Sequence, residues 1–116
     1  MKATIVLPTY NEAENIEDFL NEIYKVIPQI GGFEINTLIV DDNSPDGTAN
    51  IVKRLQETNS NIHLLENNTR GLGRAYRAGF KYAIENLNAE VLIEMDSDFS
   101  HNPEKLKEIL PPINNG

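Results

Sequence analysis

The chain has 116 residues, 40% apolar and 24% charged, which is typical of a single globular domain. Its net charge of −8 argues against a nucleic-acid partner, because binding a phosphate backbone requires a basic face. It contains no cysteine, which excludes disulfides and thiolate metal sites. The apolar runs are too short to cross a bilayer and no leader peptide is recognisable, so we expect a cytoplasmic location.

Short β-branched runs alternate with helical spacing along the chain. The first strand is predicted at Ala3–Leu7, and an amphipathic helix follows because apolar residues from Ile16 to Ile27 recur at i, i+3, i+4 and i+7. The second strand is predicted at Phe33–Val40. We expect Ser44 to cap the next helix and Pro45 to occupy its first position.

The second half of the chain repeats this alternation. Strands are predicted at Ile62–Leu65 and Val91–Met95, with a helix at Leu72–Leu87 between them and a last helix opening at Asn102–Pro103. Four strand–helix units in series predict an α/β fold, with a mainly parallel, Rossmann-like sheet and helices on both faces. We expect residues 1–116 to form one domain.

Polar residues follow every predicted strand. The carboxyl ends of parallel strands meet at one edge of a sheet, where ligands bind in such folds. We therefore expect four polar segments to lie together at that edge: residues 8–12, 41–47, 67–73 and 96–101.

The segment Asp96-Ser97-Asp98 follows an apolar strand. Two carboxylates one residue apart can share a hard divalent cation, which prefers oxygen ligands. The alternative is that Asp98 is a turn residue and Asp96 is solvated.

A second acidic pair, Asp41-Asp42, is predicted at the same edge. Acids near a helix N-terminus favour the helix dipole, and Asp46 fits that structural role. Asp42 precedes the helix start, so its carboxylate is a candidate acceptor for hydrogen bonds from a base or a ribose hydroxyl.

Three of the ten basic residues, Arg70, Arg74 and Arg77, cluster around the glycines at 71 and 73. Glycines and a helix N-terminus favour an anion, but for Arg74 and Arg77 a solvated helix face is the favoured interpretation. This glycine pair follows the third strand, whereas the dinucleotide fingerprint follows the first, so NAD binding is disfavoured. Tyr10 is a candidate for stacking on a base, or an ordinary exposed loop residue.

Together, these segments resemble the inverting family-two glycosyltransferases, and especially the polyprenyl-phosphate (dolichol-phosphate) mannosyltransferases. The resemblance rests on four segments in order: Leu7-Pro8-Thr9-Tyr10-Asn11-Glu12, Val40 to Thr48, Gly71-Leu72-Gly73 with Ala75, Tyr76 and Gly79, and Asp96-Ser97-Asp98 with Ser100, His101 and Pro103.

The resemblance implies a GT-A fold that binds a nucleotide sugar. It implies that Asp96 and Asp98 hold Mg²⁺ or Mn²⁺ against the diphosphate, with Ser97 contributing its backbone. It assigns no catalytic residue beyond these two acids. The residues that it places around the nucleoside are Pro8, Tyr10, Glu12, Val40 and Asp42.

The implied reaction transfers mannose from GDP-mannose, with inversion, to a polyprenyl phosphate. The metal would neutralise the diphosphate within an acidic site. Such an enzyme would work at the cytosolic membrane surface. A UDP-glucose donor is the main alternative within the family.

Members of that family are longer, so we expect the chain to be the N-terminal part of a catalytic domain. Its fourth strand would then lie at an open sheet edge, where it favours self-association. Two other readings are a non-catalytic nucleotide- or metal-binding module and a phosphoacceptor receiver domain. A receiver needs its acidic pair after the first strand, where this chain has Pro-Thr-Tyr-Asn.

Overall fold

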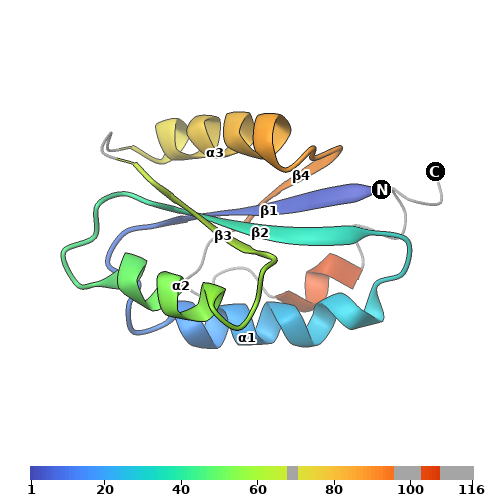
Figure 1. Ribbon diagram of the computed structural model, residues 1–116, viewed down its shortest axis with the longest axis horizontal. Coiled ribbons are helices and arrows are strands. Elements are labelled where there is room, and N and C mark those ends of the chain that lie inside the picture. The colour runs from blue at the N-terminus through green and yellow to red at the C-terminus, as the bar shows by residue number, and fades with distance from the viewer. Residues whose placement is uncertain (68–70, 96–102, 108–116) are drawn as a thin grey trace.

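A computed structural model describes residues 1–67, 71–95 and 103–107 of the chain (Figure 1). Four strands form one sheet in the order β3-β2-β1-β4, and every neighbouring pair is parallel. The predicted parallel α/β sheet is therefore confirmed. The strands are β1 (Lys2–Thr9), β2 (Glu34–Asp41), β3 (Ile62–Glu66) and β4 (Val91–Glu94).

Helices cover both faces of the sheet, as predicted (Figure 1). On one face lie α1 (Ile16–Val26) and α2 (Thr48–Gln56), and on the other lies α3 (Leu72–Asn86). Two short 3₁₀ turns, η1 and η2, follow α1 and β4; they span Ile27–Gln29 and Pro103–Lys105. The last expected helix is described only from Pro103 to Lys107. Two of its expected apolar residues, Ile109 and Leu110, lie outside the described residues.

The predicted start of α2 is wrong. The helix begins at Thr48, after Gly47 with φ 88°, and Ser44 does not cap it. The Ser44 hydroxyl instead donates a 2.6 Å hydrogen bond to the buried Asp41 carboxylate and accepts one from the Asn11 backbone N–H. A charged acceptor forms the stronger hydrogen bond, so the serine is held four residues before the first residue of the helix.

A large core fills the space between the sheet and the α1/α2 layer. Its fully buried members include long aliphatic side chains and one aromatic ring: Ile5, Leu7, Ile16, Phe19, Leu20, Ile23, Ile39 and Leu106. Burying each such side chain contributes about 1.5–3 kcal/mol, so this layer supplies most of the hydrophobic stabilisation.

The core beneath α3 is smaller, and its buried side chains are Val6, Leu38, Val40, Ala75 and Ala83. Gly79 is buried there, and a Cβ at this position would lie 2.6 Å from Val6 Cγ1 and 2.9 Å from Val40 Cγ2. The absence of a side chain therefore lets α3 approach the sheet closely. This approach also brings the start of α3 near the strand ends that form the site.

The strand β4 lies at an edge of the described sheet, as expected. It pairs with β1 over four residues, Val91–Glu94, and its Glu94 is exposed. Pro8 pairs with Val40 of β2, but its nitrogen faces the other side of β1, because backbone groups alternate along a strand. The β4 pairing ends at Val6, so the missing N–H of Pro8 interrupts no described ladder. Among the described residues, no helix has both the length and the apolar character needed to span a membrane.

Candidate nucleotide site

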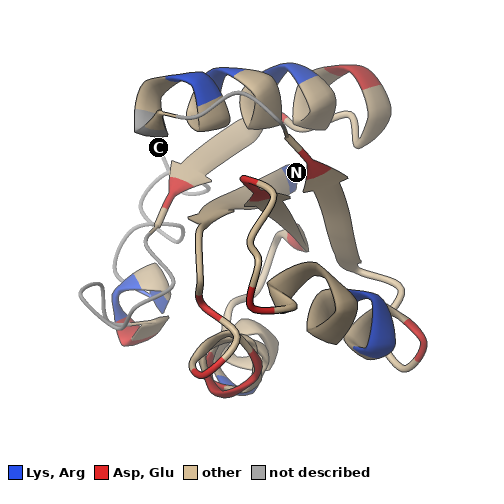
Figure 2. Ribbon diagram, turned by 90° about the vertical axis from the view of Figure 1, so that its left-hand side faces the viewer, with Lys and Arg blue, Asp and Glu red and all other residues tan. Residues whose placement is uncertain are grey.

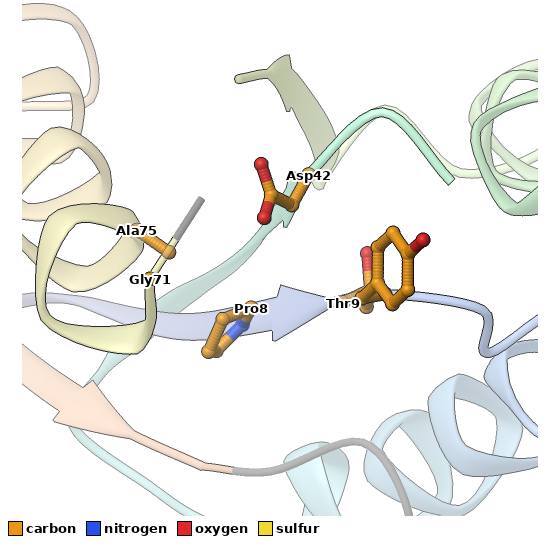
Figure 3. A pocket seen from close by; sticks show the side chains of 6 residues that line it. Pro8, Thr9, Asp42, Gly71 and Ala75 are labelled. Carbon is orange, nitrogen blue, oxygen red and sulfur yellow. The ribbon is translucent and has the colours of Figure 1, made fainter. Parts of the chain in front are cut away.

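A cavity of about 130 Å³ opens where β1 and β2 end and α3 begins (Figure 3). This is the sheet edge at which the sequence predicts a ligand. The cavity is smaller than the roughly 300–1,000 Å³ of a complete small-molecule site, so it suits one portion of a larger ligand. Its lining residues are Pro8, Thr9, Tyr10, Asp42, Gly71 and Ala75.

Asp42 supplies the only acidic side chain in this described lining. Its side chain projects from the end of β2 toward the start of α3 (Figure 3), and its backbone N–H donates a 3.0 Å hydrogen bond to the Thr9 carbonyl. The Oδ1 atom is buried and has no hydrogen-bond partner among the residues that the structure describes. A buried carboxylate oxygen without a donor is costly, and it is explained if a ligand supplies one.

The neighbouring Asp41 has a different role, because its carboxylate is already satisfied. It is 1% exposed and accepts hydrogen bonds from Thr9 Oγ1 at 2.8 Å and from the Ser44 backbone N–H at 3.0 Å. The Ser44 hydroxyl donates a third. Asp41 therefore holds the β1 and β2 loops together, and the predicted acidic pair divides into one structural and one ligand-facing carboxylate.

Asp46 holds the same two loops together from further along the chain. Its carboxylate accepts hydrogen bonds from the Ala13 backbone N–H at 3.0 Å, the Thr48 N–H at 3.1 Å and the Thr48 hydroxyl at 2.6 Å. Desolvation acts to raise the pKa of Asp46, but these hydrogen bonds outweigh it and the pKa lies below its ordinary value. The structure thus supports the helix-start role that the sequence allowed for this residue.

Three residues that the resemblance places at the nucleoside, Pro8, Tyr10 and Asp42, line the cavity together. Val40 does not line it, because its side chain is fully buried in the core beneath α3. Glu12 does not line it either. Its carbonyl accepts hydrogen bonds from the N–H groups of Asn15 and Ile16 at the start of α1, and its own N–H donates to Thr48 Oγ1.

The predicted metal ligands Asp96 and Asp98, together with Ser97, lie outside the described residues. In residues 1–67, 71–95 and 103–107, no three His, Cys, Asp or Glu side chains group as a metal site would require.

Three lining residues were not among the predicted site residues: Thr9, Gly71 and Ala75. Gly71 has φ 121°, a conformation that a side chain would strain, and it leaves the cavity mouth free of a Cβ. The glycine-rich segment before α3 was the available signal for it. Thr9 and Ala75 both lie in segments on which the family resemblance rests, but neither was singled out as a site residue; the structure identifies Thr9 by its place in the lining and its hydrogen bond to Asp41.

Arg74 and Arg77 are exposed on α3, as the solvated-face reading expects. They line a second, open hollow of about 350 Å³ with Asn67, Ala78 and Lys81. His63, on β3, forms a 3.1 Å hydrogen bond with Asn36 of β2, so it belongs to the sheet rather than to the cavity.

Comparison with known proteins shows which family and which relatives the chain is similar to. Residues 4–116 match the family "Glycosyl transferase family 2". An undecaprenyl-phosphate mannosyltransferase of Micrococcus luteus is 38% identical over 97% of this chain and 44% of its own length. A polyprenol monophosphomannose synthase of Mycolicibacterium smegmatis is 35% identical over 99% of this chain and 42% of its own.

Solved structures agree on the fold. The mannosyltransferase PcManGT of Pyrobaculum calidifontis, in complex with GDP-Man and Mn²⁺, superposes with a TM-score of 0.70 at 27% identity, over 95% of this chain and 32% of its own. TarS of S. aureus, in complex with UDP-GlcNAc, gives 0.72 at 27% identity, over 99% and 32%. These neighbours establish the GT-A type of fold.

The chain spans less than half the length of the curated relatives that it matches. The family match nevertheless extends over nearly all of its residues, from the first strand to the end. The chain belongs to glycosyl transferase family 2.

Proposed function

We propose that this chain binds the nucleotide-sugar donor of a glycosyltransferase, and that the reaction moves mannose from GDP-mannose to a polyprenyl phosphate with inversion. The observation that carries the proposal is the buried, unpartnered Oδ1 of Asp42 beside a cavity at the ligand-binding edge of a parallel sheet. The names of the two bacterial relatives support the choice of sugar and acceptor.

In this proposal the cavity holds the nucleoside. Asp42 accepts a hydrogen bond from a base N–H or a ribose hydroxyl, and Tyr10, which is 40% exposed, offers an aromatic surface for the base. Glu12 and Val40 do not line the cavity but position the elements around it. The backbone of Glu12 connects the β1 loop to α2, and Val40 sets the position of α3.

Asp96 and Asp98 are proposed to hold Mg²⁺ or Mn²⁺ against the donor diphosphate, with Ser97 contributing its backbone. Mn²⁺ in the PcManGT complex supports this choice. A bound divalent cation would stabilise the negative charge on the leaving nucleoside diphosphate. The acceptor phosphate is already an anion, so the reaction does not require a strong general base.

A lipid acceptor implies work at the cytosolic membrane surface. The TarS complex with UDP-GlcNAc favours a UDP-sugar as the second candidate donor. A non-catalytic nucleotide- or metal-binding module is a further candidate, because the chain spans only part of its relatives.

Calorimetric titration with GDP-mannose, GDP and UDP-glucose, with and without Mn²⁺, tests the proposal. We expect GDP-mannose to bind more tightly with Mn²⁺, and Asp96→Asn and Asp98→Asn to abolish that metal dependence. Asp18→Asn is the matched control, because it removes one exposed acid from α1. Binding that ignores the metal, or equal loss in the control, would contradict the metal assignment. Preference for UDP-glucose would select the second donor.

Self-association through β4 is proposed separately, because this strand lies at the edge of the described sheet. Sedimentation velocity over a range of concentrations tests it. We expect a dimer that a charged substitution such as Leu92→Lys disperses. A monomer at high concentration would contradict the idea.

A further inference from the structure

The outer side of α3 carries a row of basic residues. Arg74, Arg77 and Lys81 follow one another at i, i+3 and i+7, so they lie on one side of the helix, and all three are exposed. They line the open hollow of about 350 Å³, together with Asn67 and Ala78. In Figure 2 basic residues recur along α3, whereas the opposite layer carries both acidic and basic residues.

These three cations differ from five other basic side chains, because none of the ion pairs found among the described residues involves them. Five basic side chains elsewhere form salt bridges: those of Lys2, Lys25, Lys53, Arg54 and Lys107. Within the described part of the chain, no hydrogen bond or ion pair is formed by the side chains of Arg74, Arg77 and Lys81. An exposed positive row on a chain of net charge −8 points to an anionic partner.

An exposed apolar residue continues the same row. Ile84 lies three residues beyond Lys81 and is 55% exposed, more than any other large hydrophobic side chain described. A helix that carries basic side chains beside an exposed aliphatic one fits a lipid interface, because the cations meet head groups while the apolar side chain enters the acyl boundary. A soluble phosphate would gain nothing from Ile84.

We infer that the exposed outer side of α3, formed by Arg74, Arg77, Lys81 and Ile84, docks the protein on an anionic lipid surface. The choice of a membrane over a soluble anion also rests on the proposed function, since a polyprenyl phosphate is held in a bilayer. The same helix lines the nucleoside cavity through Gly71 and Ala75. Docking by this face therefore places the cavity beside the lipid surface from which the acceptor comes.

The attraction is modest for each residue, because one basic side chain near an anionic leaflet strengthens binding roughly fivefold. Three of them give peripheral, salt-sensitive attachment rather than insertion. Removing two should therefore lower the vesicle partition coefficient by roughly 25-fold.

Flotation of the chain with lipid vesicles tests the inference. We expect binding to phosphatidylcholine vesicles that contain phosphatidylglycerol, little binding to phosphatidylcholine alone, and release by added salt. The variant Arg77→Ala/Lys81→Ala should lose binding. The control Lys25→Ala/Lys53→Ala removes the same charge from the opposite layer and should retain it. Ile84→Ser should weaken binding without changing the net charge. Circular dichroism checks that each variant is folded.

Equal binding to neutral and anionic vesicles, or equal loss in the two double variants, would overturn the inference. So would binding of inorganic pyrophosphate that depends on Arg77 and Lys81, without any vesicle binding, because the partner would then be a soluble phosphate. The donor titration is independent of this assay. A chain that binds donor but not vesicles loses only the docking surface, and one that binds vesicles but not donor loses only the proposed nucleotide site.

Discussion

The two faces of the sheet differ in how they are filled. The α1/α2 face packs fully buried aliphatic side chains and the ring of Phe19 into a continuous core, whereas the buried residues of the α3 face are valine, leucine, alanine and a glycine. The aromatic side chains on the α3 face are only partly buried: Tyr76, Phe80 and Tyr82. The α3 face also contributes the cavity lining at Gly71 and Ala75 and the exposed basic row. The stability of the domain therefore depends mainly on one face, and the opposite face is free to carry binding groups.

Hydrogen-bonded polar side chains of the sheet occur on both of its faces. Side chains alternate along a strand, so His63 points to the side of Leu65 and α3, while Ile62 and Leu64 pack in the larger core. Its partner Asn36, on β2, faces the same side of the sheet, because the neighbouring Ile35 packs in the larger core. On the other face, Tyr24 of α1 and Thr37 of β2 form a 2.9 Å side-chain hydrogen bond, so both faces accommodate a part-buried polar pair.

The largest effect on stability is expected from Phe19→Ala, at the centre of the α1/α2 face. The ring is fully buried, and its removal leaves a cavity that the packed helix cannot close, at a cost of about 3–5 kcal/mol. Urea unfolding measures the change. A loss below about 1 kcal/mol would show that this face is not the main source of stability.

Asp41→Ala should destabilise the fold by about 1.5–3 kcal/mol, because Thr9 and Ser44 lose a charged acceptor in a buried setting. The same loops shape the cavity, so donor affinity should fall with stability. Urea unfolding and donor titration measure both. Unchanged stability would contradict the structural role of this carboxylate.

Gly79→Ala tests the close approach of α3. The added Cβ would meet Val6 and Val40 below 3.0 Å, so we expect a loss of about 1–2 kcal/mol after the better helix propensity of alanine is included. Gly73→Ala is the control on the same helix, because its Cβ meets nothing within 4 Å. It should be neutral or stabilising. Equal effects of the two variants would show that α3 is not tightly packed.

The smallest effect is expected from pH. Burial lowers the pKa of His63 below its ordinary value of 6.5, so the unfolded chain takes up the proton first. The free energy of unfolding that neutral His63 contributes is fully present above pH 6.5 and is lost as the pH falls toward the lowered pKa. Thermal unfolding between neutral and mildly acidic pH should show this decline, and His63→Gln should reduce it. A decline that is unchanged in the variant would assign it to other groups.

Much of the fold follows from the sequence because hydrophobic periodicity is a local signal. The runs at Ile16–Ile27 and Leu72–Leu87 mark α1 and α3, and the strand-end rule places Pro8, Tyr10 and Asp42 at one edge. The start of α2 did not follow, because Ser44 bonds to Asp41 across a turn instead of capping. The different roles of Asp41 and Asp42 depend on their burial and their hydrogen-bond partners. Neither can be read from two identical residues that are adjacent in the sequence.

The position of Val40 shows the same limit. A resemblance carries residue identities, but only the packing shows that this side chain is enclosed beneath α3 rather than lining the cavity. Likewise, Arg74 and Arg77 are visible in the sequence as basic residues. Only the structure shows that they form no ion pair with the described acids and that Ile84, further along the helix, is exposed.

Asp42→Asn provides the most direct test of the central claim that the Asp42 cavity holds the donor nucleoside. The substitution keeps the shape of the side chain and removes the charge on a buried oxygen without a partner. GDP titration and thermal unfolding should be measured on the same samples. We predict at least a tenfold loss of GDP affinity, about 1.4 kcal/mol, with unchanged or raised thermal stability. Unchanged GDP affinity in a folded variant would contradict the account.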